Sequence, residues 1–333
     1  MSDVKLKTCL IRAEGFDPWR NQALEEALLH WVPNDAVVLY LWQNENTVVI
    51  GRHQNVWKEA RWKQLEEAGG KLARRLSGGG AVYHDRGNLN FTFCANHRHY
   101  DVHRQMKVIL GAVKKLGIDA EFSGRNDLTV DGQKFSGNAF HRTPRNAMHH
   151  GTLLLDVDFN KLSAYLNPPQ EKLRSKGVES VRARVVNLAG LNPKITLQGT
   201  IDALHEALEE EYAGPGEVME EAQFSEEIDR YYPRYADWDW RYGETPDFDI
   251  DYSTRFVWGT IEIGFTLKDA KVKQVRVYSD TLESLLIDRI EASLEGVPFK
   301  RDELFRALDD TPESDEQVQI VNDIKDWLDE KEL

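Results

Sequence analysis

Three consecutive glycines that follow a pair of arginines constrain this chain more than any other feature of its sequence. They lie in the stretch ARRLSGGGAVYHDRGN, residues 73–88. Glycine has no Cβ, so the backbone of Gly78, Gly79 and Gly80 can approach a ligand closely and adopt positive φ without strain. Strand-like apolar segments follow at Val82–Tyr83 and 89–93, so we expect a loop between sheet elements.

The chemistry around these glycines favours an anion. Exposed backbone amides beside Arg74 and Arg75 suit a phosphate or a carboxylate. The loop is not a P-loop, because no Gly-Lys-Ser/Thr follows the glycines. A bare glycine triplet is more often a mobile turn, and it is the length of the constellation, through to Asp85 and Gly87–Asn88, that favours a binding loop.

Composition sets the class of protein. The 333 residues are 41% hydrophobic and 29% charged, with a net charge of −14. An acidic chain of this kind disfavours non-specific binding of nucleic acid, so an anion site requires a local concentration of cations. The chain shows no membrane span and no secretory signal, and Cys9 and Cys94 are its only cysteines, so we expect a soluble cytoplasmic protein.

Hydrophobic periodicity predicts mixed helices and paired strands, which favours an α+β class over a regular βαβ array. Asp17–Pro18 is a typical helix start, with Leu24, Leu28 and Trp31 on one face of the helix that follows. The expected strands cover residues 4–12, 37–42, 47–51, 128–130 and 148–157, and the expected helices cover 17–31, 56–68, 102–116 and 201–212.

A second informative stretch surrounds a hairpin. Asp131–Gly132 between apolar segments is a strong signal for a two-residue turn. Lys134 follows the turn as a point cation beside the small residues of SGNA, 136–139, which leave room for a ligand. His149 and His150 are adjacent on the next strand and therefore point to opposite faces, which makes them a poor metal site.

A third stretch concentrates positive charge. It reads EKLRSKGVESVRARV, residues 171–185, and carries five cations within thirteen residues of an acidic chain. An ordinary charged loop would also fit, but a loop of this kind can close over a phosphoryl group.

Together these motifs resemble the lipoate–protein ligase A family. The resemblance rests on GRHQN (51–55), the glycine loop, GRND (124–127), KFSGNA (134–139), HHGT (149–152) and KGVESVRARV (176–185), in the family's order and at its spacing. It covers about the first 190 residues. The resemblance implies a fold shared with biotin protein ligases, with a catalytic domain of mixed sheets flanked by helices over 1–246. A small C-terminal α/β accessory domain is expected over 247–333.

The resemblance also implies the reaction. (R)-Lipoate and ATP, with Mg²⁺, would give lipoyl-adenylate and pyrophosphate, and a lysine of an acceptor would then take the lipoyl group. The implied acceptors are the lipoyl domains of 2-oxoacid dehydrogenase E2 subunits and the glycine-cleavage H protein. We expect a monomer that binds neither nucleic acid nor membrane.

The family assigns roles by position. Lys134 is the expected catalytic residue, and Asp127 is the expected Mg²⁺ ligand. The expected ATP and adenylate contacts are Arg75, Gly80, Ala81, Val82, Tyr83, Asn126, Lys134, Lys176, Arg182 and Arg184. The expected lipoate contacts are Arg75, Ser77, Gly78, Gly79, Lys134, Gly137, Ala139 and His149, and His84 could also line the pocket.

Three alternatives stay open. An octanoyl or lipoyl transferase of the same fold would need an activated cysteine, and Cys94 has no obvious base beside it. A biotin ligase would carry a different glycine loop. A non-catalytic lipoate sensor could dispense with Lys134.

The C-terminal part predicts structure more than chemistry. Strands are expected over 248–252, 255–265 and 272–278, followed by helices over 281–294, 300–308 and 314–330.

Overall fold

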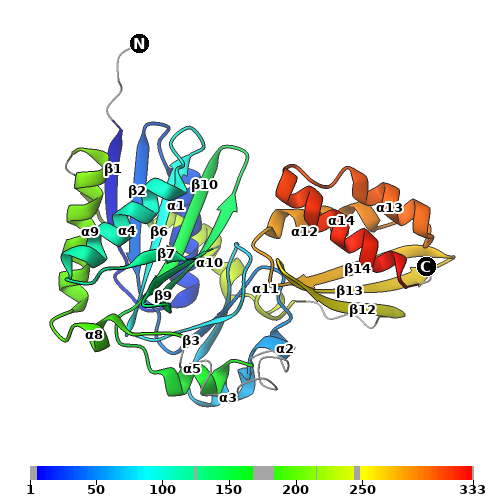
Figure 1. Cartoon of the computed structure of the whole chain (residues 1–333), viewed down its shortest axis with the longest axis horizontal. Coiled ribbons are helices and arrows are strands. Elements are labelled where there is room, and N and C mark those ends of the chain that lie inside the picture. Colours follow the sequence, from blue (N-terminus) through cyan, green and yellow to red (C-terminus); the bar gives the residue numbers. More distant parts are fainter. Residues whose placement is uncertain (1–5, 124–125, 168–183, 215, 244–247, 332–333) are drawn as a thin grey trace, which may run out of the picture. The chain divides into compact units, whose positions relative to one another are not determined.

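The computed structural model describes residues 6–123, 126–167, 184–214, 216–243 and 248–331 (Figure 1). The chain forms two compact units. The first takes the described residues of Met1–Ile50, Val56–Arg75 and Ala81–Arg241, and the second takes those of Gly51–Asn55, Leu76–Gly80 and Tyr242–Leu333. The domain boundary that we predict at 246/247 falls within 244–247, outside the described residues.

The first unit is built on an eight-stranded mixed sheet with the strand order β11-β1-β2-β6-β10-β9-β8-β7. β1 pairs in parallel with β2 and β11, and the other neighbours are antiparallel. The strands are β1 (Lys7–Arg12), β2 (Ala36–Trp42), β6 (Asn88–Asn96), β7 (Glu121–Ser123), β8 (Asp127–Val130), β9 (Gln133–Arg142), β10 (Asn146–Leu154) and β11 (Glu217–Met219).

A second, three-stranded sheet in this unit has the order β4-β3-β5, formed by β3 (Thr47–Ile50), β4 (Lys71–Arg74) and β5 (Val82–His84). The helices of the unit are α1 (Pro18–Trp31), α2 (Val56–Glu59), α3 (Trp62–Glu67), α4 (Val102–Lys115), α5 (Phe159–Tyr165), α8 (Leu188–Leu191), α9 (Leu197–Tyr212), η1 (Glu221–Phe224), α10 (Ser225–Ala236) and α11 (Trp238–Tyr242).

Helices cover both faces of the large sheet. Glu25 of α1 hydrogen-bonds to His150 on one face, and Gln105 of α4 hydrogen-bonds to His149 on the other. The α4 face carries the apolar core, in which Leu39, Phe91 and Phe93 are fully buried against α4 and α9. The α1 face is more polar, and the site described below lies on that face.

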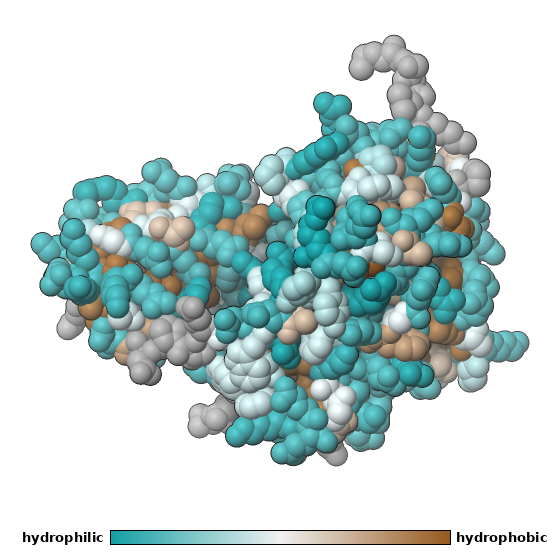
Figure 2. All heavy atoms as spheres, turned by 180° about the vertical axis from the view of Figure 1, so that it is seen from behind, coloured by the Kyte–Doolittle hydropathy of each residue, from teal (hydrophilic) through white to brown (hydrophobic). Residues whose placement is uncertain are grey.

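The second unit is a three-stranded antiparallel sheet, β12-β13-β14, packed with helices around its own core. Its elements are β12 (Ile250–Phe256), β13 (Gly259–Lys268), β14 (Lys271–Ser279), α12 (Ser284–Leu294), α13 (Arg301–Asp309) and α14 (Asp315–Asp329). Figure 2 shows a surface that is mostly hydrophilic, with apolar residues in small separate areas. Among the described residues, no helix combines the length and the apolar character needed to cross a bilayer.

Several local predictions are confirmed. Asp17 caps α1 through a hydrogen bond from the Trp19 amide at 2.9 Å, with Pro18 in the first turn. The β8–β9 turn has φ values of 51° at Asp131 and 77° at Gly132, as a two-residue turn of this type requires.

Three predictions are corrected. The single helix expected over 56–68 is two helices, because Ala60 bridges to Leu166 and the Arg61 amide bonds to the Tyr165 carbonyl. The strand expected over 148–157 is β10, which ends at Leu154, because the amides of Leu155 and Asp156 bond to the Gly87 carbonyl instead. The strand expected over 255–265 is interrupted by the turn between β12 and β13, where Gly259 has φ 155°.

Candidate active site

The α1 face of the large sheet brings several predicted site residues together. The strand register pairs Ala139 with His150, and Thr152 with Asn90, on this face. The Gly137 amide donates to Thr152 Oγ1 at 3.1 Å, which places Gly137 beside them. Gly137 and Ala139 are the small residues that the sequence offered as space for a ligand, and both lie on the α1 face because side chains alternate along a strand.

Lys134 reaches over this surface. A Cβ added at Gly137 would come within 2.7 Å of Lys134 Nζ, so the glycine is what allows the lysine to lie there. Lys134 Nζ forms an ion pair with Asp127 Oδ1 at 2.7 Å, and both side chains are 37% exposed. A cation and a carboxylate predicted for one site are therefore adjacent and accessible to a ligand.

The backbone of Lys134 also fixes the end of the cation-rich loop. Its amide donates to the Arg184 carbonyl at 2.7 Å, and its carbonyl accepts from the Val186 amide at 2.9 Å. Arg184 is thereby held at the strand that carries Lys134. Lys176 and Arg182, the other predicted cations of the loop, lie outside the described residues.

Asn126 has a structural role. Its side-chain amide donates to the Asn138 carbonyl at 2.7 Å, and Asn138 Nδ2 donates back to the Asn126 carbonyl at 2.9 Å. These bonds hold the start of β8 against β9 and so support the position of Asp127. A contact of Asn126 with the nucleotide stays a prediction.

The two arginines before the glycines have different surroundings. Arg74 donates to the carbonyls of Trp240 and Arg241, at 2.8 and 3.1 Å, so its guanidinium binds backbone rather than standing free for an anion. Arg75 is 7% exposed and donates to the Val49 carbonyl at 3.3 Å. Burial lowers the pKa of Arg75 to about 10, an effect that the Glu25 carboxylate opposes.

Glu25 is the centre of a buried polar network that the sequence did not reveal. It accepts hydrogen bonds from His150 Nδ1 at 2.8 Å and from Thr92 Oγ1 at 2.6 Å. Thr92 in turn accepts from Trp42 Nε1 at 3.0 Å. The segment NQALEE, residues 21–26, is where the sequence could have indicated this network, because its polar residues are buried along with its apolar ones.

His149 lies on the α4 face, opposite His150, as the alternation of the strand predicted. Its ring nitrogens are within 3.0 Å of Gln105 Oε1 and 2.9 Å of Asn138 Oδ1, and it stacks on Phe93. The ring is completely buried. The contact of His149 with lipoate stays a prediction. The histidine of this pair that lies on the α1 face is His150.

The segment after the glycines is fixed from two sides. β5 pairs with β3, and the Tyr83 hydroxyl donates to Asn46 Oδ1 at 3.0 Å. Beyond it, Asp85 accepts from the amides of Gly87 and Asp158, at 2.8 and 2.9 Å. A Cβ at Gly87 would lie 1.9 Å from the Asp156 carbonyl oxygen, so only glycine fits this turn. These contacts hold Ala81–Tyr83 in place, and Gly80 has open space around its Cα.

The first part of the glycine loop, by contrast, packs within the second unit. The Gly79 amide donates to the Thr281 carbonyl at 2.9 Å, and the Arg52 amide donates to the Ser77 carbonyl at 2.9 Å. A Cβ at Gly78 would come within 2.1 Å of the Thr281 carbonyl oxygen. The absence of a side chain at Gly78 therefore leaves room for the backbone at Thr281. The ligand contacts predicted for Ser77, Gly78 and Gly79 stay predictions.

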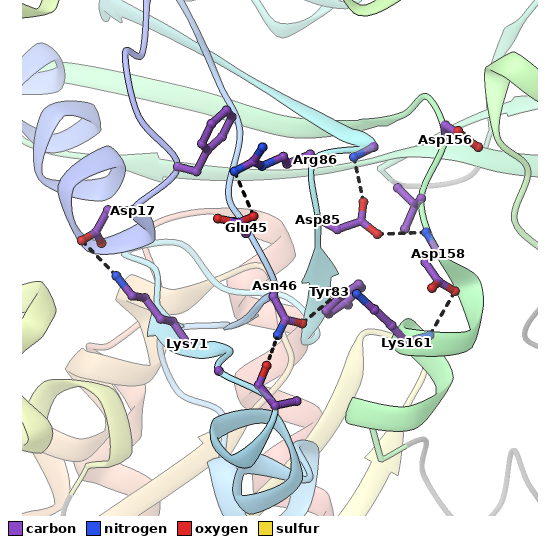
Figure 3. Close-up of a pocket in the computed structure, with 15 residues that line it drawn as sticks. Asp17, Glu45, Asn46, Lys71, Tyr83, Asp85, Arg86, Asp156, Asp158 and Lys161 are labelled. Carbon is purple, nitrogen blue, oxygen red and sulfur yellow. Dashed lines mark hydrogen bonds and ion pairs between the residues drawn. The ribbon is translucent and has the colours of Figure 1, made fainter.

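A separate cleft, lined by Tyr83 of β5 and by residues of neighbouring segments, lies apart from these residues (Figure 3). Its volume is about 860 Å³, and of the predicted site residues that the structure describes it includes Tyr83 alone. Several of its charges are paired, with Lys71 at 3.1 Å from Asp17 and Arg86 at 2.9 Å from Glu45. Because Lys134 and Arg75 are not among its lining residues, we do not assign the predicted reaction to this cleft.

Cys94 is not an activated nucleophile. It is completely buried, and burial, reinforced by Glu25, raises the pKa of its thiol well above the ordinary value. A thioester mechanism needs a thiolate at neutral pH. The structure therefore disfavours the transferase alternative.

Buried neutral histidines predict a pH dependence of stability. Burial lowers the pKa of both His84 and His149 to about 3. The unfolded chain protonates these residues below about pH 6.5 and the native state does not, so stability is lost as pH falls from that value. Between pH 7.5 and 5.5 the free energy of unfolding should fall by about 2.7 kcal/mol, or about 1.4 kcal/mol for each histidine.

Urea unfolding at the two pH values measures this difference. In His149→Gln it should shrink by about half. A wild-type protein equally stable at both pH values would contradict the prediction.

Comparison with known proteins matches both parts of the chain to families. Residues 17–209 match the model "Lipoyl protein ligase A/B catalytic domain", and residues 245–328 match "Bacterial lipoate protein ligase C-terminus". A curated lipoate-protein ligase A from Psychrobacter cryohalolentis is 40% identical, over 97% of this chain and 98% of the relative.

Solved structures agree. The P. falciparum protein LipL1, in complex with lipoate, superimposes with a TM-score of 0.84 at 30% identity, covering 96% of this chain and 99% of that one. The bi-partite lipoate protein ligase of Thermoplasma acidophilum, described with its E2 lipoyl domain, has a TM-score of 0.64 at 25% identity and covers 74% of this chain and 100% of that one. The expected fold class, mixed sheets flanked by helices with a smaller C-terminal part, is thereby confirmed.

Proposed function

We propose that this chain, which belongs to the lipoate–protein ligase A family, works in two steps that both use the α1 face. In the first, the carboxylate of (R)-lipoate attacks the α-phosphate of ATP, giving lipoyl-adenylate and releasing pyrophosphate. In the second, the ε-amine of an acceptor lysine attacks the acyl carbon and AMP leaves.

The observation that carries this proposal is the position of Lys134. Its ammonium lies over Gly137, next to Asp127, on the sheet face that also carries Ala139 and His150. Bringing a carboxylate to a phosphate sets two anions together, so a fixed cation at that point stabilises the transition state. The same cation stabilises the charge that returns to the phosphate when AMP leaves.

Other residues of the chain would hold the nucleotide. The amides of Gly80–Tyr83 are the proposed donors to the phosphate oxygens. The contacts of Asp85 and Asn46 described above hold Ala81–Tyr83, and fixed amide donors suit phosphate oxygens. Arg75, the residue directly after β4, is a buried cation. Arg184, held by the backbone of Lys134, would bring Lys176 and Arg182 of the same loop to the adenylate.

Asp127 fits the role of the predicted Mg²⁺ ligand. The described residues include no cluster of three or more metal-ligating side chains. Mg²⁺ bound with a nucleotide uses one or two protein carboxylates, with phosphates and waters as the remaining ligands. Asp127 supplies one accessible carboxylate, and bound Mg²⁺ would neutralise phosphate charge there.

The acceptor is proposed to be a lipoyl domain of a 2-oxoacid dehydrogenase E2 subunit or the glycine-cleavage H protein. Family membership supports this, as does the likeness to the Thermoplasma ligase described with its E2 lipoyl domain. A monomer acting in the cytoplasm is part of the proposal, and the low cysteine content of the chain supports the cytoplasmic location.

Lipoate-dependent exchange of labelled pyrophosphate into ATP, without any acceptor, tests the first step. Exchange with lipoate and none with biotin is expected. Absence of exchange, combined with acyl transfer from a carrier protein without ATP, would make the chain a transferase. Absence of both activities would favour the sensor.

A further inference from the structure

The structure points to a residue that determines which acyl chain this enzyme accepts. Gln22 is 1% exposed, and neither its Nε2 nor its Oε1 has a hydrogen-bond partner among the described residues. Leaving buried polar atoms unpaired is costly, and most buried amides are paired. Both ends of the Gln22 carboxamide therefore have hydrogen-bonding capacity that a bound molecule can use.

The place of Gln22 on α1 gives the direction of its side chain. Glu25 lies one helical turn further on, and residues three apart on a helix are neighbours. Glu25 contacts His150 and Thr92 on the large sheet. On the other side of Gln22, Trp19 contacts the Leu72 carbonyl of β4. Gln22 therefore faces the region between the large sheet and β4, after which Arg75 follows.

Two further donors without partners lie nearby. Asn90 Nδ2 and His84 Nε2 are both buried, and neither has a hydrogen-bond partner within the described ranges of the chain. Trp42 connects them, since it pairs with Asn90 across the strands and packs its ring 6.2 Å from that of His84. Asn44 Nδ2 lies 3.1 Å from His84 Nδ1, so with Asn44 donating, the ring proton is on Nε2. Two buried N–H donors in this region, together with the acceptor Asn88 Oδ1 beside Asn90, thus lack partners among the described residues.

The distance from Lys134 suits the far end of an acyl chain. Lys134 lies over β9, whereas Asn90 and Thr92 are on β6, two strands away in the order β9-β10-β6. Two strand spacings are roughly 10 Å. This is comparable to the length of an extended lipoyl chain whose carboxyl group is at Lys134.

We propose that Gln22 is a specificity-determining residue that favours a sulfur-bearing ring at the end of the acyl chain over an all-carbon chain of similar length. The sulfur atoms of lipoate offer lone pairs and polarisable surface to the Gln22 amide. Octanoate offers neither, so it would bury the amide unpaired. Sites built to hydrogen-bond a substrate reject analogues that lack the partner, because the protein group is left unsatisfied.

The test compares lipoate with octanoate in wild type and Gln22→Leu. This inference rests on the proposed function, so two measurements are made: the dissociation constant of each acid by calorimetry without ATP, and pyrophosphate exchange. In Gln22→Leu, octanoate binding should tighten and lipoate binding weaken, so that their affinity ratio falls by about tenfold, the equivalent of one lost net hydrogen bond. Gln22→Met, whose side chain has a different shape from that of leucine, should lower the affinity ratio in the same way.

Tyr212→Phe is the matched control. It removes the Tyr212 hydroxyl, a buried atom of α9 on the α4 face of the sheet that has no hydrogen-bond partner in the part of the chain that the structure describes. The ratio should be unchanged in this variant. An equal change in both affinities in Gln22→Leu and Gln22→Met, or no binding of either acid to wild type, would overturn the role of Gln22. Selective binding without pyrophosphate exchange would support Gln22 while removing the proposed adenylation.

Discussion

Replacing Lys134 with alanine should reduce lipoate-dependent pyrophosphate exchange by roughly 10²- to 10³-fold, the loss typical of removing one fixed charge-stabilising group. The fold should persist. The ion pair with Asp127 is accessible to solvent, with both side chains 37% exposed, and such pairs contribute no more than about 1 kcal/mol to stability. A large loss of rate with a nearly unchanged free energy of unfolding is therefore the expected signature.

Lys161→Ala is the control for this experiment. Lys161 is an exposed lysine that lines the separate cleft of Figure 3 and is not on the α1 face, so its removal should leave exchange unchanged. The variants are compared by exchange kinetics and by urea unfolding. Exchange by Lys134→Ala at close to the wild-type rate would remove Lys134 from the mechanism.

Arg75→Ala should lower both activity and stability. The exchange rate should fall at least 100-fold, because a buried cation near the proposed phosphate position is lost. The free energy of unfolding should fall by about 1–3 kcal/mol, because the Val49 carbonyl loses a hydrogen-bond donor and Glu25, itself 1% exposed, loses a nearby positive charge.

Arg74→Ala separates the two effects, since it removes the neighbouring arginine. Arg74 binds the carbonyls of Trp240 and Arg241, so its loss should destabilise the protein while kcat/KM for lipoate stays within about threefold, a difference of less than one kcal/mol. If both arginine variants lost exchange equally, Arg75 would have no separate role in binding the nucleotide.

The adjacent arginines also show what sequence reasoning could not decide. Both precede the glycines, and both suited an anion on chemical grounds. Arg74 is bound by backbone carbonyls more than 160 residues away, whereas Arg75 is buried near Glu25 of α1. Such partners are far apart in the chain, and no local pattern encodes them.

The sequence by itself determined those features that depend on neighbouring residues. Asp17–Pro18 starts α1 because a cap and a fixed φ act within one turn. Asp131–Gly132 forms the hairpin turn because those residues tolerate positive φ. His149 and His150 point to opposite faces because side chains alternate along a strand. The spacing of its motifs also identified the family, which the comparisons confirm.

Tertiary structure alone decided which polar residues are buried together. Gln22 and Glu25 are polar residues of α1, yet packing against the large sheet and β4 buries them both. In the same way, Gly78 makes room for the Thr281 carbonyl, some 200 residues further along the chain. The physical reason is that burial and close approach are properties of segments brought together by folding, and the free energy of a buried polar atom depends on a partner that local sequence does not contain.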